Sequence, residues 1–359
     1  MSACRRLLIT RERLVGRVLQ DRKNEHLDIV LGGLGRSGAH TGFESIAFEH
    51  VALPELDMAD IELGTDFIGK RINAPLLVSS MTGGPERAAD INRNLAIACQ
   101  SLGIALAVGS QRIAIESGAQ AGLGAELRQL APDIPLLGNI GAAQLNLGFG
   151  VDQARRAVEM IGADALIIHL NPLQEAVQPE GDRNWRGLLG KIEQLACELG
   201  VPLVVKEVGA GISGRVARRL ADAGVSVIDV AGAGGTSWAA VEAERARVPA
   251  QAAVARAFAD WGIPTAQAIV EVRAACPDVQ IIGSGGIRNG VDVAKAIRLG
   301  ANVVGQASGI LDAAIRSPED VIEALSVTMT QLRVACFCTG STNLAALAAA
   351  PIRDVSRFG

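Results

Sequence analysis

Three glycines within residues 204–220, VVKEVGAGISGRVARRL, have the spacing of a nucleotide-binding loop. They are Gly209, Gly211 and Gly214, and they follow a β-rich run and precede a helical pattern. Asp229 closes the next strand-like run. In dinucleotide-binding folds such glycines let the backbone approach a pyrophosphate, and an acidic residue binds the ribose. The motif alone discriminates poorly, because the same glycines also let a loop approach a bound ring or a single phosphate.

A second glycine-rich pattern indicates a phosphate site. Residues 281–290, IIGSGGIRNG, hold Gly283, Gly285, Gly286 and Arg288, and VVGQASG follows about twenty residues later. Loops after the last two strands of an α/β barrel often present backbone N–H groups and a helix N-terminus to a phosphate. The alternative is that these glycines only form tight turns. Paired glycines and an arginine in two consecutive units favour the phosphate site.

The elements that carry these residues alternate regularly from residue 74 onward. Short β-branched or leucine-rich runs alternate with amphipathic segments rich in alanine, arginine and glutamate. Eight such units predict a (β/α)8 TIM barrel rather than a doubly wound sheet, which usually has fewer strands. The predicted strands are residues 75–80, 104–109, 135–140, 165–170, 202–208, 225–231, 279–283 and 302–306.

The chemistry of such a barrel lies where its strands end. The segments there are rich in glycine and polar residues, and we expect them to converge on one face: SSMTGG, VGSQR, GNIGAAQ, HLNPLQE, KEVGAGIS, DVAGAGGTS, GSGGIRNG and GQASG. The first glycine motif follows the fifth strand, which ends in Lys206 and Glu207. The first strand of a dinucleotide-binding fold is instead usually apolar up to its glycine turn.

We expect the barrel to span residues 74–315, between an N-terminal extension, 1–73, and a C-terminal helical segment, 316–359. The extension contains GGLGRSGAH at 32–40, which is not followed by a helix-forming run and is predicted to be a flexible loop that could act as a lid.

Composition and charge exclude several classes of protein. Hydrophobic residues make up 49% and charged residues 20%, with 41 glycines, which is typical of a globular α/β enzyme. A net charge of −4 without a dense Lys/Arg tract argues against a nucleic-acid partner. Six scattered cysteines without C-x-x-C pairs predict reduced thiols. With no signal-like start and no uninterrupted apolar run near the length of a membrane span, we expect a cytoplasmic protein without a membrane partner.

Eight segments in order along the chain resemble those of type 2 isopentenyl diphosphate isomerases, the FMN-dependent family that interconverts isopentenyl and dimethylallyl diphosphates. They are RKNEHL (22–27), MTGG (81–84), GSQR (109–112), NIGAAQ (139–144), HLNPLQEAVQPEGDRNW (169–185), KEVGAGIS (206–213), AGAGGTSW (231–238) and GSGGIRNG (283–290). The run at 169–185 is distinctive, whereas GSGGIRNG is shared by many flavin barrels. The barrel of this family is the fold that the strand pattern predicts independently.

The resemblance implies FMN at the mouth of the barrel, active in its reduced form, with NADPH as the reductant. Lys206 would place positive charge beside flavin N1 and O2 and favour the anionic reduced form. The alternative for Lys206 is an ion pair with a neighbouring carboxylate, because a lysine inside a barrel mouth needs a partner. The residues implied to contact FMN are Met81, Thr82, Gly83, Ser110, Asn139, Lys206, Ser213, Thr236, Gly285, Gly286, Arg288, Gln306 and Ala307.

The resemblance also implies a prenyl diphosphate substrate. Its roughly three negative charges require cations and a divalent metal in the site. Glu175 resembles the carboxylate that holds Mg²⁺. Without the resemblance, Arg22 and Lys23 would be interpreted as a solvated helix face and Trp238 as packing. Asn24 stands where the family commonly has an acid. The residues implied to bind substrate are Arg22, Lys23, His26, Arg112, His169, Asn171, Gln174 and Trp238.

Moving the double bond adds one proton and removes another, with no net redox change. The residues implied in catalysis are Gln174, Lys206 and His169. Because an amide is a poor base, we expect reduced FMN to be the main proton carrier and Gln174 to be a positioning or relay residue. His169 could otherwise be a satisfied core histidine. NADPH would only reduce the flavin, so the loop at 209–214 would face FMN and need not bind a dinucleotide.

Two other functions are compatible with a barrel of this kind. An FMN-dependent α-hydroxy-acid oxidase shares the barrel and phosphate loops but uses a histidine base late in the barrel. The four histidines here, His26, His40, His50 and His169, all lie in the first half of the chain. A non-catalytic FMN- or phosphate-binding barrel is the other possibility. The resemblance further implies a homo-oligomer, either a tetramer or an octamer.

Overall fold

The centre of the protein is a closed barrel of eight parallel strands, in the order β10-β11-β4-β5-β6-β7-β8-β9. The computed structural model describes residues 25–81, 86–118 and 122–354. Each predicted strand region overlaps one observed strand, with β6 and β10 ending one residue later than predicted, so the (β/α)8 prediction is confirmed. The strands are β4 (Leu76–Val78), β5 (Ala105–Ala107), β6 (Leu136–Gly141), β7 (Ala165–His169), β8 (Leu203–Lys206), β9 (Val227–Asp229), β10 (Gln280–Ser284) and β11 (Val303–Gln306).

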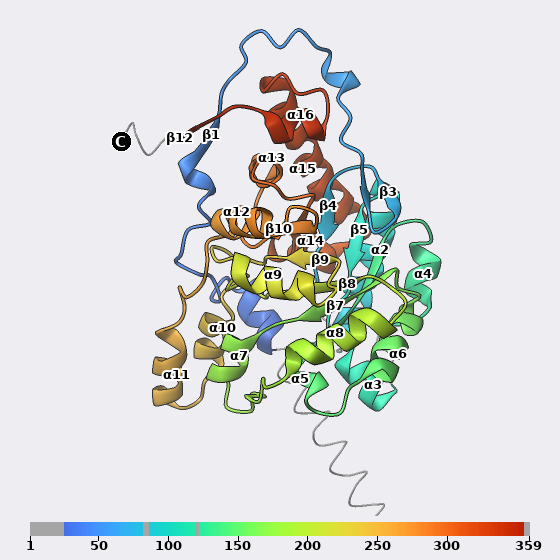
Figure 1. Cartoon of the computed structure of the whole chain (residues 1–359), viewed down its shortest axis with the longest axis vertical. Coiled ribbons are helices and arrows are strands. Elements are labelled where there is room, and N and C mark those ends of the chain that lie inside the picture. The colour runs from blue at the N-terminus through green and yellow to red at the C-terminus, as the bar shows by residue number, and fades with distance from the viewer. Residues whose placement is uncertain (1–24, 82–85, 119–121, 355–359) are drawn as a thin grey trace, which may run out of the picture.

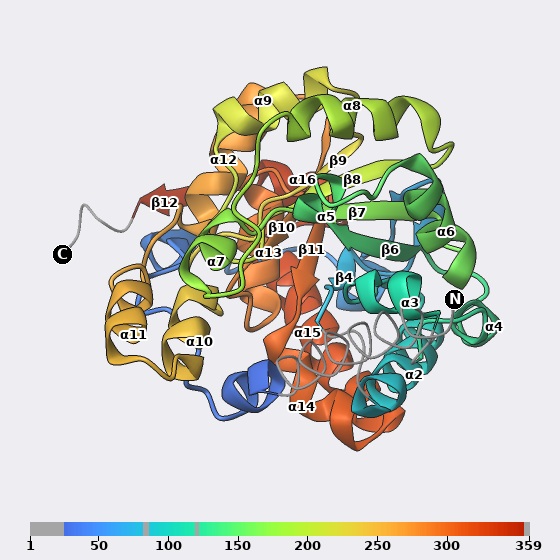
Figure 2. The same cartoon turned by 90° about the horizontal axis from the view of Figure 1, so that it is seen from below.

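Helices surround the strands in a ring (Figure 2). Each buries an apolar face against the barrel, as α9 illustrates: Ala217 and Leu220 are buried there, while Arg218 and Arg219 point to solvent. The covering helices are α2 (Glu86–Leu102), α4 (Glu126–Leu130), α6 (Val151–Ile161), α8 (Leu188–Glu198), α9 (Gly214–Asp222), α12 (Thr265–Ala275), α13 (Gly290–Arg298) and α14 (Ser308–Arg316).

Five further helices follow strand ends and lie together at the lower end of the view in Figure 1. They mark the C-terminal face of the barrel, where the sequence predicts the chemistry. They are α3 (Arg112–Ser117), α5 (Ala142–Leu145), α7 (Pro172–Val177), α10 (Trp238–Arg245) and α11 (Pro249–Arg256).

The opposite end of the barrel is closed by a hairpin of β2 (Thr65–Phe67) and β3 (Lys70–Ile72). Phe67 and Ile72 are fully buried against the apolar residues that fill the barrel interior, such as Leu77, Leu137 and Val204. With this end plugged by side chains, the C-terminal face is the end left to receive ligands.

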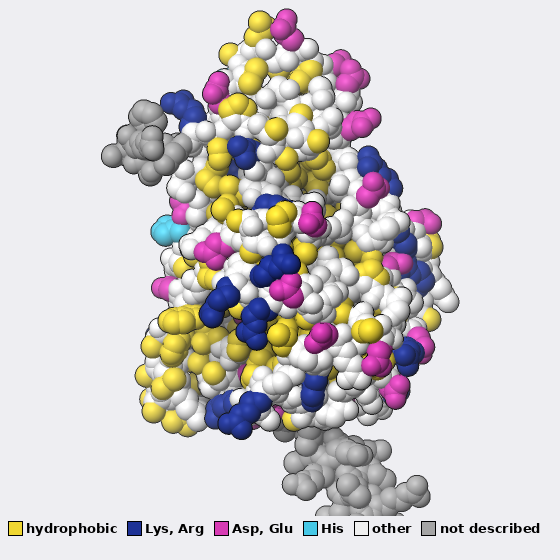
Figure 3. Space-filling model, in the orientation of Figure 1, with side chains coloured by type: hydrophobic (Ala, Val, Ile, Leu, Met, Phe, Trp, Pro, Cys, Tyr) yellow, Lys and Arg dark blue, Asp and Glu magenta, His cyan; other side chains and the backbone are white. Residues whose placement is uncertain are grey.

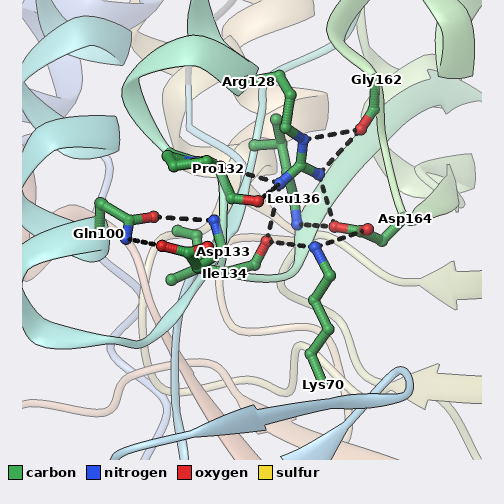
Figure 4. A network of polar contacts seen from close by, with 10 residues as sticks. Lys70, Gln100, Arg128, Pro132, Asp133, Ile134, Leu136, Gly162 and Asp164 are labelled. Carbon is green, nitrogen blue, oxygen red and sulfur yellow. Dashed lines mark hydrogen bonds and ion pairs between the residues drawn. The ribbon is translucent and has the colours of Figure 1, made fainter.

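A polar network ties the hairpin to the barrel (Figure 4). Lys70 Nζ lies 2.8 Å from Asp164 Oδ1, and Arg128 Nη2 lies 2.6 Å from Asp164 Oδ2. Partial burial acts to raise the pKa of Asp164, but hydrogen bonds from Lys70, the Leu136 N–H and Arg128 outweigh it, so the pKa is lowered. The carboxylate thus joins the hairpin, α4 and the start of β7.

Segments from the two ends of the chain meet outside the barrel. A helical stretch at residues 25–31, η1 (Phe43–Ser45), β1 (Ile46–Phe48) and η2 (Met58–Asp60) precede the hairpin. After α14 come α15 (Pro318–Cys338), α16 (Leu344–Ala349) and β12 (Ile352–Asp354), and β12 pairs antiparallel with β1. Figure 1 shows this pair at the end away from the C-terminal face of the barrel.

Helix α15 is the single helix among the described residues with the length and composition to cross a membrane. It packs against α2, α13 and α14. One such helix is weak grounds for a membrane span, because core helices of soluble proteins have the same properties.

The glycine-rich segment at 32–40 is a loop, as predicted, and it is bonded to the barrel face. Ser37 N–H donates to the Gly235 carbonyl, and Ser237 N–H donates to the Gly35 carbonyl. Asp260 Oδ1 accepts the Gly38 N–H at 2.6 Å. The loop therefore lies across the start of α10.

Candidate active site

The ends of four consecutive strands bring polar residues to one level of the barrel mouth. Gly141 of β6 is opposite His169 of β7, which is opposite Lys206 of β8. Lys206 in turn is opposite Asp229 of β9. Because the strands are parallel, this register places the residues side by side around the rim. Two of the residues predicted for catalysis, His169 and Lys206, are therefore neighbours.

His169 is oriented by a buried amide. Its Nδ1 lies 2.8 Å from Asn139 Oδ1. Asn139 Nδ2 donates to the Val108 carbonyl at 3.2 Å, so Asn139 Oδ1 is the acceptor and His169 Nδ1 carries the proton. A Cβ at Gly141 would lie 2.9 Å from His169 Nε2, so only glycine leaves room for the imidazole there.

Lys206 is buried and lies next to a carboxylate, as the alternative interpretation of this lysine required. Its Nζ donates to the Glu207 carbonyl at 2.8 Å and lies 3.7 Å from Asp229 Oδ2. Asp229 Oδ1 accepts a 2.5 Å hydrogen bond from Ser284 Oγ. Burial raises the pKa of Asp229, while Lys206 and Ser284 act in the opposite direction.

The loop after β8 binds a carboxylate of its own. Glu207 Oε2 accepts the N–H groups of Val208, Gly209 and Ala210 at 2.6, 2.7 and 2.5 Å. These are the N–H groups that a pyrophosphate would need in a dinucleotide site. Because Glu207 occupies these N–H groups, the loop has no free anion site for a dinucleotide.

The three glycines of this motif serve close packing between loops. A Cβ at Gly209, Gly211 or Gly214 would lie less than 3.0 Å from the carbonyl oxygen of Thr236, Ile263 or Glu271, respectively. The spacing that resembles a nucleotide-binding loop thus has a packing cause.

Three buried polar atoms at the ends of β4 and β11 indicate the place of a polar ligand. Ser79 Oγ and Ser80 Oγ, which follow β4, and Gln306 Oε1, at the end of β11, have no hydrogen-bond partner among the described residues. Buried polar groups are normally satisfied, so a bound molecule is the simplest explanation for the three. The flavin ring, with its several polar edge atoms, fits them.

The predicted phosphate loop has a backbone that requires glycine. Gly285 and Gly286 have φ of 106° and 69°, which favour glycine. A Cβ at Gly285 would lie 2.2 Å from the Gly232 carbonyl oxygen. A cavity of about 450 Å³ opens beside this loop, lined by Arg288, Gln306 and residues of α14 and α15. The two strand ends predicted for the FMN phosphate therefore border one cavity.

The remaining predicted flavin residues occupy several strand ends. Met81 follows β4, Ser110 follows β5, and Ala307 links β11 to α14. Ser213 caps α9 by accepting the Val216 N–H at 3.4 Å. Thr236 forms an isolated bridge with Arg36 of the glycine-rich loop. Thr82 and Gly83 lie outside the described residues.

On the neighbouring helix α7, Asn171, Gln174 and Glu175 lie together. The Glu175 carboxylate is buried and accepts hydrogen bonds from Asn171 Nδ2 at 2.9 Å, Gln178 Nε2 at 2.6 Å and the Asp182 N–H at 2.7 Å. The described residues contain no group of three or more metal-ligating His, Cys, Asp or Glu side chains. A Mg²⁺ held by Glu175 would complete its shell with phosphate oxygens and water, as Mg²⁺ commonly does.

A carboxylate that the sequence did not single out connects the predicted substrate residues. Glu242 of α10 is 3% exposed. Its Oε1 lies 2.9 Å from His26 Nε2 and 3.3 Å from Gln174 Nε2, and its Oε2 lies 3.0 Å from Arg245 Nε. Burial acts to raise the pKa of Glu242, but His26 and Arg245 outweigh it, so the pKa is lowered and the group is ionised.

Two tryptophans complete this side of the mouth. The ring of His26 meets Trp238 edge to face, with centroids 5.2 Å apart. Trp238, Gln174 and Glu207 line a small pocket together with Trp261, which is 64% exposed. The sequence pattern did not single out Trp261 or Glu242 as site residues. For Glu242 the sequence did contain one signal, because Glu242 is four residues after Trp238 and thus lies on the same helix face.

The predicted cations are only partly placed. Arg112 of α3 pairs with Glu116 at 3.0 Å and with Asp182 at 3.4 Å, which brings it to the loop that follows Glu175. Arg22 and Lys23 lie outside the described residues.

Comparisons with known proteins agree with this flavin barrel. Residues 152–354 match the family model of FMN-dependent dehydrogenases. Isopentenyl-diphosphate delta-isomerases are 63% identical in Stutzerimonas stutzeri, over 94% of this chain and 98% of the relative, and 62% in Xanthobacter autotrophicus, over 92% and 96%. The isomerase of Nostoc sp. is 50% identical over 90% of this chain and 93% of the relative.

Solved structures support the fold alone, because their identities are low. A mandelate oxidase superposes with a TM-score of 0.64 at 18% identity, covering 89% of this chain and 94% of that one. A flavocytochrome b2 superposes with a TM-score of 0.65 at 17% identity, covering 91% and 82%. Since the isomerases match over nearly the whole chain and the family model covers residues 152–354, this chain belongs to the FMN-dependent, type 2 family of isopentenyl-diphosphate delta-isomerases.

Proposed function

We propose that this protein interconverts isopentenyl and dimethylallyl diphosphates at the barrel mouth, with reduced FMN as cofactor and Mg²⁺ on the diphosphate. Relatives that are 50 to 63% identical carry this activity in their names. The observation that carries the proposal is the gathering of His26 and Gln174 on Glu242, beside the ends of β7 and β8. At this place a charged substrate would be bound next to the flavin.

Reduced FMN, when bound, supplies a group that can give and take a proton without net redox change. Lys206 would place a positive charge at the N1/O2 edge of the ring, and Asn139 keeps the imidazole of His169 in one orientation. The loop with Gly285, Gly286 and Arg288 would hold the FMN phosphate. These roles are supported by the unpartnered polar atoms and the cavity at this mouth.

Gln174 positions the substrate rather than acting as a base. Its Oε1 accepts a hydrogen bond from Asn171 Nδ2 at 3.1 Å, and its Nε2 donates to Glu242 Oε1. Both ends of the amide are therefore engaged, and an amide is a poor base in any case. Glu242 holds Gln174 in place and stays ionised beside His26.

The diphosphate would be bound by a Mg²⁺ ion held by Glu175 and by cations from separate parts of the chain. Arg112 and His26 are the described candidates, and Arg22 and Lys23 are proposed to join them. Arg112 lies beside the loop that follows Glu175, which supports a shared site for metal and diphosphate. Trp238 and Trp261 offer apolar surface to the short isoprenoid chain.

NADPH is proposed as the reductant of the flavin. Because Glu207 occupies the N–H groups of the loop after β8, NADPH would reach the flavin without a dinucleotide-binding loop at this place.

We also propose that the protein is a cytoplasmic homo-oligomer. Figure 3 shows apolar side chains gathered over α10 and α11, at the lower left of the view. Val248 and Val254 are 47% and 56% exposed there. Exposed apolar patches of this kind mark interfaces in many proteins, and light scattering would measure the assembly.

The decisive test is anaerobic proton NMR of isopentenyl diphosphate in D₂O with protein, FMN, NADPH and Mg²⁺. Dimethylallyl diphosphate carrying deuterium should appear, and omitting NADPH should abolish it. An unchanged substrate with bound, reducible FMN would refute the isomerase function. Mandelate and lactate should leave the oxidised flavin unreduced, because all four histidines lie in the first half of the chain.

A further inference from the structure

The pair formed by Lys206 and Asp229 is the most deeply buried pair of opposite charges at the barrel mouth. The two residues are register partners on β8 and β9, and their side chains are 10% and 0% exposed. A buried charge is costly unless it is paired and hydrogen-bonded. The place of Asp229 inside the mouth therefore needs an explanation beyond packing.

The geometry shows a counter-ion held slightly apart. Asp229 Oδ1 is bound by Ser284 Oγ at 2.5 Å, a length typical of a hydroxyl donating to an ionised carboxylate. Burial raises the pKa of this carboxyl, whereas the Lys206 ammonium and the Ser284 hydroxyl both favour its charged form. Asp229 Oδ2 has no hydrogen-bond partner among the described residues and lies 3.7 Å from Lys206 Nζ. The carboxylate thus attracts the ammonium without using up one of its N–H donors.

Lys206 consequently keeps donors for a ligand. An ammonium has three N–H donors, and the Glu207 carbonyl takes one at 2.8 Å. A buried ammonium needs an opposite charge nearby, and Asp229 supplies it at 3.7 Å. Asp229 therefore stabilises the ammonium at the position where a positive charge is useful to a flavin.

We propose that Asp229 is a positioning residue for the flavin, which acts through Lys206 by holding its ammonium in place and aimed at the ring. Ser284 supports it by fixing the carboxylate, and Ser284 directly precedes the phosphate loop at Gly285. This inference rests on the proposed place of Lys206 at flavin N1/O2. It adds a residue that no part of the sequence pattern assigned to the cofactor's electronics.

The test is the two-electron midpoint potential of bound FMN in Asp229→Asn, which keeps the shape of the side chain and removes its charge. The lysine should then lose the counter-ion that holds its ammonium towards the ring, and reduced FMN should bind at least tenfold more weakly relative to oxidised FMN. For a two-electron couple, a tenfold change is a fall of about 30 mV. Lys206→Met should lower the potential in the same direction.

If Asp229 acts through Lys206, the effects of the two substitutions on the potential must not add. Adding Asp229→Asn to Lys206→Met should produce no further shift, because the residue it acts through is gone. Asp133→Asn, at the plugged end of the barrel, removes one carboxylate charge far from the mouth and is the matched control. Ser284→Ala keeps the carboxylate charge, and a smaller fall is expected from it; it also serves if Asp229→Asn does not fold.

An unchanged potential in Asp229→Asn, together with a fall in Lys206→Met, would overturn the inference and leave the proposed function intact. A raised potential would also overturn it, because Asp229 would then act on the flavin directly. If Lys206→Met itself leaves the potential unchanged, the proposed flavin contact of Lys206 is wrong, and this failure is distinguishable from the first.

Discussion

Replacing Glu242 by glutamine should uncouple the substrate side of the site from the flavin side. The substitution keeps the size of the side chain but removes the charge that accepts hydrogen bonds from Gln174 and Arg245 and pairs with His26. The new amide would turn its oxygen to the stronger donor, Arg245. Its NH₂ group would then face the Gln174 amide nitrogen, which is also a donor.

The expected loss of activity follows from the one hydrogen bond that the glutamine cannot replace, the one that Gln174 donates to Glu242. A hydrogen bond to a charged group contributes about 1.5 to 3 kcal/mol, and about 1.4 kcal/mol corresponds to tenfold. Glu242→Gln should therefore lower kcat/KM by roughly 10- to 150-fold. The affinity for FMN should stay the same, because the described contacts of Glu242 are with His26, Gln174 and Arg245 and not with the predicted flavin residues.

A matched control lies two residues away on the same helix. Glu244 is partly exposed and pairs with Arg256 at 3.2 Å, so Glu244→Gln should change little. The assay is initial isomerisation rate under anaerobic conditions, with FMN binding measured separately by fluorescence. A Glu242→Gln enzyme within about threefold of the wild type would refute the role given to this carboxylate, because that is less than one such hydrogen bond.

Three other perturbations test separate parts of the structure. Glu175→Gln should raise the Mg²⁺ concentration needed for half-maximal substrate binding by at least about tenfold; an unchanged Mg²⁺ dependence would remove Glu175 from the metal site. Gly285→Ala should weaken FMN binding by about tenfold or more, because its Cβ would meet a carbonyl oxygen at 2.2 Å, whereas Gly190→Ala, with open space around it, should leave titration of the apoprotein with FMN unaltered. Asp164→Asn should destabilise the fold at neutral pH by about 1 to 2 kcal/mol in urea unfolding. Since the folded pKa of Asp164 is lowered from 3.8, its contribution is present in full above that value and lost as pH falls through the folded pKa. Variant and wild type should therefore begin to converge below about pH 3.8 and become equally stable below the folded pKa. A difference that persists there would contradict the ion-pair explanation, and Asp66→Asn, in an exposed pair 3.7 Å long, should have no effect at either pH.

The local sequence pattern was sufficient to predict the barrel and the face of the barrel that carries the candidate site. A parallel strand buried on both sides must be a short apolar run, and its covering helix must be apolar on one side, so the repeat is visible in the chain itself. The glycine pair Gly285 and Gly286 predicted a tight loop, because glycine favours the positive φ that such a loop requires. Segments that follow parallel strands necessarily share one face, which is why His169 and Lys206 could be expected together.

Contacts between distant segments were decided only by the tertiary structure. Glu242 looks like any helical carboxylate in WAAVEAER, and its burial depends on His26, 216 residues earlier, and Gln174, 68 residues earlier. Glu207 satisfies its own loop, which turned an apparent nucleotide motif into a packing motif. Asp229 meets Lys206 because β8 and β9 pair in one register, and a shift of one residue would send the carboxylate to the other face of the sheet. Periodicity specifies which face of an element is buried, but the partner of a buried charge is set by how the elements pack.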